Sequence, residues 1–70
     1  MKLSARNQLP ANVKKVTEGA VMSEVVVEID GGHEVVAAIT AESARNLALE
    51  PGREVTVVIK STEVMLAVDD

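Results

Sequence analysis

The sequence predicts an all-β protein, a small five-stranded Greek-key barrel of the OB type with one short helix between its third and fourth strands. Two observations predict this class. Valine occurs 13 times in 70 residues, whereas Phe, Trp and Tyr are absent, and stiff β-branched side chains pack well on a pleated sheet. The apolar stretches are also short and are separated by turns that contain glycine or proline, as in small barrels.

Turn signals divide the chain into its expected elements. Strands are expected over residues 2–17, 20–29, 33–39, 54–60 and 64–68, and the helix over residues 41–47. Glu18-Gly19 is expected to make a turn, and Asp30-Gly31-Gly32 is a strong hairpin signal because its glycines adopt positive φ at little cost. Pro10 falls inside the first strand, and because proline cannot donate to a ladder, we expect a bend, a bulge or an edge position there.

The helix has a recognisable start and is followed by a recognisable turn. Thr40 is predicted to cap the helix, since its hydroxyl can accept a hydrogen bond from the backbone N–H of Glu42 or Ser43. The apolar stripe of the helix is predicted to consist of Ala44, Leu47 and Ala48. Glu50-Pro51-Gly52-Arg53 then has its proline and its glycine at the positions that a type II turn prefers.

The length predicts a single domain over residues 1–70, with a core of marginal size. The chain has no cysteine, so no disulfide can supplement that core. Residues 25–27 and 35–39 are apolar on both faces of their strands, and an antiparallel sheet of that kind needs a cover on each side. One cover is the domain's own core, and we expect a neighbouring subunit to supply the other.

Charge and composition argue against several partners. The net charge is −4, which disfavours nucleic acid, and the chain has no aromatic side chain on which a base could stack. No apolar run is long enough to span a membrane. Residues 1–6 lead into polar sequence and not into the apolar segment of a signal peptide. A cytoplasmic protein is expected, with neither nucleic acid nor membrane as a partner.

The sequence contains no arrangement of residues that is typical of an enzyme active site. His33 is the only histidine and is expected at an exposed hairpin, without a third group to orient it as a base. Lys60 and Ser61 are adjacent, so on a strand they face opposite sides and do not make a nucleophilic pair. The carboxylates are scattered and no His or Cys cluster accompanies them, so no bound metal cation is expected.

Groups that donate hydrogen bonds are better placed for binding an oxyanion. Molybdate and tungstate are fully deprotonated at neutral pH, so a selective site offers hydroxyls, backbone N–H groups and cations, and no carboxylate. Thr40 and Ser43 lie at the expected helix start, where free N–H groups favour an anion. Ser4 and Arg6 share one face of a strand. Lys60-Ser61 closes the fourth strand with two further donors.

Each of these residues also has a purely structural interpretation. Thr40 can act as a helix cap alone, and Ser43 as an ordinary residue of the first helical turn. Arg6 and Lys60, taken singly, resemble the charged side chains of any surface. Glu42 belongs to the same first turn, so its carboxylate has to point away if an anion binds there.

Five segments of the chain carry a resemblance to a known family. They are residues 4–8 (SARNQ), 19–25 (GAVMSEV), 38–43 (AITAES), 49–52 (LEPG) and 58–64 (VIKSTEV). In this order and spacing they resemble the molbindins, the small Mop proteins of the Mop/TOBE type. The same module occurs as the molybdate-sensing part of molybdenum regulators and as a domain appended to transporter ATPases.

The resemblance implies an OB-like barrel assembled as a hexamer, a trimer of dimers, with molybdate or tungstate bound between subunits and no organic cofactor. The residues that it assigns to the anion are Ser4, Arg6, Thr40, Ser43, Lys60 and Ser61, some of them through backbone N–H groups. Ser4 and Arg6 are expected from a different subunit than Thr40 and Ser43. A possible second site near a symmetry axis is assigned to Gly19, Ala20, Val21, Met22 and Ser23.

The function expected from the sequence is therefore cytoplasmic binding of molybdate or tungstate for molybdenum storage and homeostasis, without catalysis. The alternative is an oligomerisation or regulatory module that docks a protein partner and does not bind an oxyanion. A third reading, an OB domain for single-stranded nucleic acid, conflicts with the acidic balance.

Overall fold

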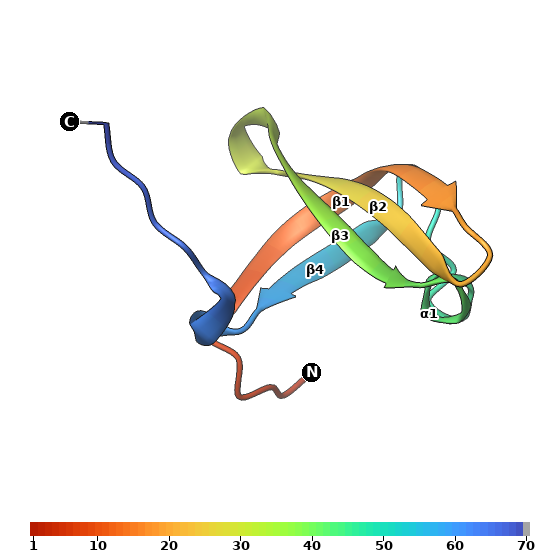
Figure 1. Cartoon of the computed structure of the whole chain (residues 1–70), viewed down its shortest axis with the longest axis horizontal. Helices are drawn as coiled ribbons and strands as arrows, with labels where there is room; N and C mark the ends of the chain where they lie inside the picture. The colour runs from red at the N-terminus through yellow and green to blue at the C-terminus, as the bar shows by residue number, and fades with distance from the viewer. Residues whose placement is uncertain (70) are drawn as a thin grey trace.

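The chain folds into one antiparallel sheet with a short helix at one end (Figure 1). The computed structural model describes residues 1–69, so Asp70, the last residue of the predicted domain, lies outside the described residues. The elements are β1 (Asn7–Glu18), β2 (Met22–Ile29), β3 (His33–Thr40), α1 (Ala41–Asn46) and β4 (Glu54–Ile59), with 3-10 turns η1 (Asp30–Gly32) and η2 (Ser61–Glu63).

The strand order is that of a Greek key. β1, β2 and β3 follow one another as antiparallel neighbours, and β4 returns to the far side of β1, which gives the spatial order β3-β2-β1-β4. The predicted all-β class and Greek-key connection are therefore confirmed, as is the single helix between the third and fourth strands.

Two finer expectations differ from the structure. The sheet has four strands and not five, because residues 64–68 have no hydrogen-bonded neighbour among the described residues. The sheet is also open rather than a closed barrel, since β3 and β4 are its two edges and do not pair with each other. A strand needs a partner as well as β-branched residues, and this chain alone supplies none to that segment.

β1 is the strand that links the two halves of the sheet. It begins at Asn7 and not near residue 2, because its partner β4 ends at Ile59, directly opposite Asn7. At Pro10 only β4 is paired with β1, since pairing with β2 starts at Ala11. The missing N–H of proline is tolerated at such a half-free position. The irregularity in register lies further along, between Val13 and Lys15.

The core is small and consists of aliphatic side chains. Four residues of β1 and β2 are buried at its centre: Ala11, Val13, Val25 and Val27. Partly buried side chains from β3, β4 and the loop after α1 surround them. The outer face of the sheet remains apolar in places, with Val36 at 60% and Val58 at 42% exposure. Such exposure agrees with the expectation of a further cover on this side.

The predicted turns and the helix cap are confirmed. Gly31, Gly32 and Gly52 all have positive φ, and the amide of Arg53 donates to the Glu50 carbonyl at 3.1 Å, which closes the turn around Pro51. The helix buries Ala41 and Ala44. The predicted apolar stripe is wrong at Leu47, which is 57% exposed, and at Ala48, which is also exposed, because the regular helix ends at Asn46. Leu47 follows as the C-cap and Ala48 has a positive φ of 53°.

Candidate anion-binding site

Four of the six residues assigned to the anion meet at one end of the sheet. Because Asn7 pairs with Ile59, Arg6 on the N-terminal segment and Lys60 after β4 emerge from the same end of the ladder. Ser4 and Ser61 lie beside them along the chain, and all four residues are exposed. Register therefore places two segments that are more than 50 residues apart in sequence, and that carry these two cations and two hydroxyls, at the same end of the sheet.

Two amide side chains hold the N-terminal segment in place. The Asn7 side chain donates to the Ile59 carbonyl at 3.1 Å, and the Gln8 side chain donates to the Ala5 carbonyl at 2.8 Å. Neither residue was predicted to contribute to the site. Both belong to the SARNQ segment, which the sequence had singled out. Their role as donors could not be predicted, because it depends on which backbone carbonyls lie next to them in the fold.

Thr40 and Ser43 form a hydroxyl pair at the opposite end. The Ser43 amide donates to Thr40 Oγ1 at 3.0 Å, which is the predicted helix cap, and the Thr40 hydroxyl donates to Ser43 Oγ at 2.7 Å. The Thr40 hydroxyl proton is thereby used, while that of Ser43 remains free to donate outward. Ser43 is consequently the better direct donor of the two, and Thr40 orients it.

The two groups of donors cannot meet within one chain. Thr40 pairs with Met22 at the start of β2, next to the end of β1 at Glu18, whereas Arg6 precedes the start of β1. The twelve residues of β1 separate them, at roughly 3.3 Å per residue. Figure 1 shows α1 and η2 at opposite ends of the sheet. An anion that contacts both groups has to lie between chains.

The segment assigned to a second site adjoins Thr40. The Val21 carbonyl accepts a hydrogen bond from the Ala41 amide at 2.7 Å, so this turn is fixed to the helix start. Gly19, Ala20, Val21 and Met22 are exposed. Ser23 is different, since it is 2% exposed and its hydroxyl has no hydrogen-bond partner among the described residues. In this fold the Ser23 side chain faces the core and not a surface site.

Arg6 and Lys60 do not belong to the ion pairs of the described residues. The ion pairs among the described residues join Lys14 to Glu28 at 3.4 Å and to Glu34 at 2.9 Å, on the surface of the sheet. The hydrogen bond and the charge of Glu34, and then those of Glu28, raise the pKa of Lys14. Arg6 and Lys60 form no ion pair with a described residue, so an arriving anion does not have to displace an internal carboxylate.

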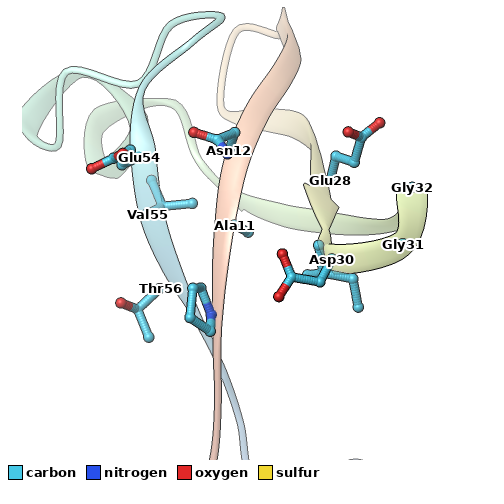
Figure 2. Close-up of a pocket in the computed structure, with 11 residues that line it drawn as sticks. Ala11, Asn12, Glu28, Asp30, Gly31, Gly32, Glu54, Val55 and Thr56 are labelled. Carbon is cyan, nitrogen blue, oxygen red and sulfur yellow. The ribbon is translucent and has the colours of Figure 1, made fainter.

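A separate hollow of about 580 Å³ is unsuited to anions (Figure 2). Its rim carries the carboxylates of Glu28, Asp30 and Glu54, which would repel an oxyanion. Within residues 1–69, His, Asp and Glu side chains nowhere gather in groups of three or more that could hold a metal ion. The described part of the chain also contains no helix with the length and apolar character needed to cross a membrane.

Known proteins match this chain along most of its length. The family model described as the TOBE domain matches residues 3–66. The molybdenum-pterin-binding protein 3 of Clostridium pasteurianum is 48% identical over 66 residues, which are 94% of this chain and 97% of that protein. The match therefore extends over nearly the whole of both chains, and the resemblance inferred from the five segments is confirmed.

Solved structures agree with the sequence matches. A molybdate-binding protein from Sporomusa ovata superposes with a TM-score of 0.91 at 44% identity, covering 97% of this chain and 100% of that one. The cytoplasmic molybdate-binding protein ModG, in a form with molybdate bound, gives a TM-score of 0.82 at 40% identity. That superposition covers 94% of this chain and 53% of ModG.

Proposed function

Because this chain belongs to the TOBE domain family, we propose that it binds molybdate reversibly. The observation that carries the proposal is the match along nearly its whole length to the Sporomusa ovata molybdate-binding protein. The donor-rich ends of the sheet support it, since they offer hydroxyls and cations that no described carboxylate occupies. Tungstate has the same charge and shape, so we propose that it binds as well.

We propose that each anion lies between two chains. One chain contributes the group at the η2 end of the sheet, and the other contributes the pair at the start of α1. The full set is Ser4, Arg6, Lys60 and Ser61 from one side with Thr40 and Ser43 from the other. Hydrogen bonds to a charged group are each worth about 1.5–3 kcal/mol, so removal of one donor is expected to weaken binding by about tenfold or more.

The turn before β2 is proposed as part of a second anion site. Its exposed residues, Gly19 to Met22, place backbone groups next to the helix start. Since the Ser23 side chain is buried, Ser23 can contribute there only through its backbone. We propose that copies of this turn gather around a symmetry axis, where small residues allow backbones to approach one another closely.

The proposed assembly is a hexamer built as a trimer of dimers. A site divided between two ends of the sheet is incomplete in one chain, which supports an oligomer, and the resemblance to the Mop proteins is what implies the hexamer. Neighbouring copies would cover the apolar outer face and complete a five-stranded barrel around each core. The proposed role is cytoplasmic storage and homeostasis of molybdenum, by binding without catalysis.

Isothermal titration calorimetry with molybdate, tungstate and sulfate tests the proposal. Molybdate and tungstate are expected to release heat with a fixed number of anions per chain, and Arg6→Ala is expected to weaken binding at least tenfold. Arg53→Ala is the matched control, because Arg53 is an exposed arginine in the turn before β4, outside both groups. A folded, assembled protein that gives no heat with molybdate would instead support the docking-module alternative.

A further inference from the structure

The Asn7 side chain holds the peptide unit that immediately precedes Lys60. Its amide donates to the Ile59 carbonyl at 3.1 Å, in a partly buried position, and joins two residues that are 52 apart in sequence. Pairing between β1 and β4 ends at Asn7 and Ile59, so no ladder pair beyond them fixes Lys60. The end of a ladder opens more readily than its centre, and the Asn7 side chain adds a hydrogen bond at that end.

The Gln8 side chain holds the corresponding peptide unit before Arg6. Its amide donates to the Ala5 carbonyl at 2.8 Å, between exposed residues that are three apart in sequence. A carbonyl oxygen only accepts, so in both hydrogen bonds the donor is the side-chain nitrogen. Each cation at this end of the sheet therefore follows a carbonyl that a side-chain amide fixes.

A fixed carbonyl also fixes the N–H group of the next residue. Within residues 1–69 no peptide bond is cis, and in a trans peptide the C=O and the following N–H lie in one plane and point in opposite directions. The two hydrogen bonds therefore direct the Lys60 N–H away from the Asn7 side chain and the Arg6 N–H away from the Gln8 side chain. Backbone N–H groups that are already oriented stabilise an oxyanion without reorganisation when it arrives.

We propose that Asn7 and Gln8 are positioning residues of the anion site. They orient the backbone N–H groups of Lys60 and Arg6 toward the oxyanion and do not contact it themselves. This inference rests on the proposed function, because it assigns further roles at the same site. It predicts that loss of either side-chain amide weakens binding although every hydroxyl and every cation of the site is retained.

Calorimetry with sodium molybdate on the assembled protein tests the two residues separately. Asn7→Ala and Gln8→Ala are each expected to weaken binding by about three- to tenfold, which is the net worth of one neutral hydrogen bond. Asn12→Ala is the matched control, since Asn12 is an exposed asparagine of β1 that pairs with Glu54 at the other end of β4, and it is expected to bind as the unaltered protein does. None of these changes alters the net charge. Unchanged affinity in either Asn7→Ala or Gln8→Ala would overturn the proposal.

Amide proton resonances distinguish positioning from a general loss of structure. In the isotope-labelled, assembled protein, molybdate is expected to shift the amide protons of Arg6 and Lys60 downfield, because each then donates to a charged acceptor. Asn7→Ala should lose the shift at Lys60 and retain it at Arg6, and Gln8→Ala should do the reverse. Gln8→Ala keeps the test available if Asn7→Ala does not fold, since the Gln8 bond is local and exposed.

The outcomes separate this inference from the function on which it rests. An unaltered protein that gives molybdate heat but no shift at Arg6 and Lys60 would overturn the inference alone. Loss of both shifts together in a variant would do the same, because it would indicate a disturbed site and not one misdirected N–H group. An assembled, unaltered protein that gives no molybdate heat would overturn the proposed function and the inference with it.

Discussion

Thr40 and Ser43 form a reciprocal pair, in which the serine amide donates to the threonine hydroxyl oxygen and the threonine hydroxyl donates to the serine oxygen. The two hydroxyls therefore have different roles. Thr40 satisfies a backbone amide that the helix start would otherwise leave free, and it fixes the orientation of Ser43. Ser43 retains a proton that can be donated to an oxyanion.

This difference predicts separate effects of substitution. Thr40→Val removes the cap and is expected to lower the free energy of unfolding by about 1 kcal/mol, together with molybdate affinity. Ser43→Ala leaves the amide-to-Thr40 bond intact, so its effect on stability is expected to stay within about 0.5 kcal/mol, while affinity falls by about tenfold. Urea unfolding and calorimetry on both variants separate the two roles, and equal losses of stability would contradict them.

Gly19 is expected to tolerate no side chain. A Cβ at this position would overlap the Met22 carbonyl oxygen, which is fixed because it accepts a hydrogen bond from the Gly19 amide at 2.9 Å. Gly19→Ala is therefore expected to cost about 1–3 kcal/mol. Gly52→Ala is the control, since a Cβ there meets no atom within 4 Å and only its positive φ opposes it. A smaller loss at Gly19 than at Gly52 would contradict the close approach.

Ser23 provides a test of what happens to a buried hydroxyl on assembly. An unpartnered buried hydroxyl costs about 1–3 kcal/mol, so Ser23→Ala is expected to stabilise the chain by about 1 kcal/mol in urea unfolding. A destabilising effect would mean that the Ser23 hydroxyl has a hydrogen-bond partner in the assembled protein. Ser61→Ala serves as a comparison because Ser61 is exposed, and little change in stability is expected there.

The raised pKa of Lys14 predicts that the free energy of unfolding falls at alkaline pH. Its pKa is raised in the folded chain, first by the hydrogen bond with Glu34, so the charged form is favoured by folding. The resulting stabilisation is fully present below the ordinary value of 10.5 and is lost as pH rises through the higher folded pKa. Lys14→Met is expected to reduce the fall in urea midpoint above that pH. An unchanged fall would contradict the assignment to Lys14.

The local features of the fold were predictable from single residues. Glycine at positions 31 and 52 indicated positive φ, and Thr40 indicated a helix cap, and the structure contains all three. These features depend on steric and hydrogen-bonding preferences within a few residues, which one sequence contains in full. The turns also indicated that β1, β2 and β3 are successive neighbours, whereas the return of β4 to the far side of β1 was expected from the type of barrel and not from a turn.

Contacts between segments that are far apart in the sequence were harder to predict. The adjacency of Arg6 and Lys60 depends on the register of β1 against β4, which no local pattern states. The β propensity of residues 64–68 was read as a strand, yet no described neighbour pairs with them, since propensity says nothing about which chain supplies the partner. That Arg6 and Ser43 come from different chains was implied by the family resemblance alone, and the length of β1 that separates them within one chain supports that expectation.

Mixing two defective variants tests most directly that the anion lies between chains. Arg6→Ala and Ser43→Ala are each expected to bind molybdate at least tenfold more weakly in calorimetry. When they are unfolded together and refolded as a mixture, random assembly should restore the original affinity at about one quarter of the sites, because some interfaces then join an intact Arg6 to an intact Ser43. Recovery of that high-affinity fraction is the predicted result. A mixture that binds no better than the separate variants would contradict a site shared between chains.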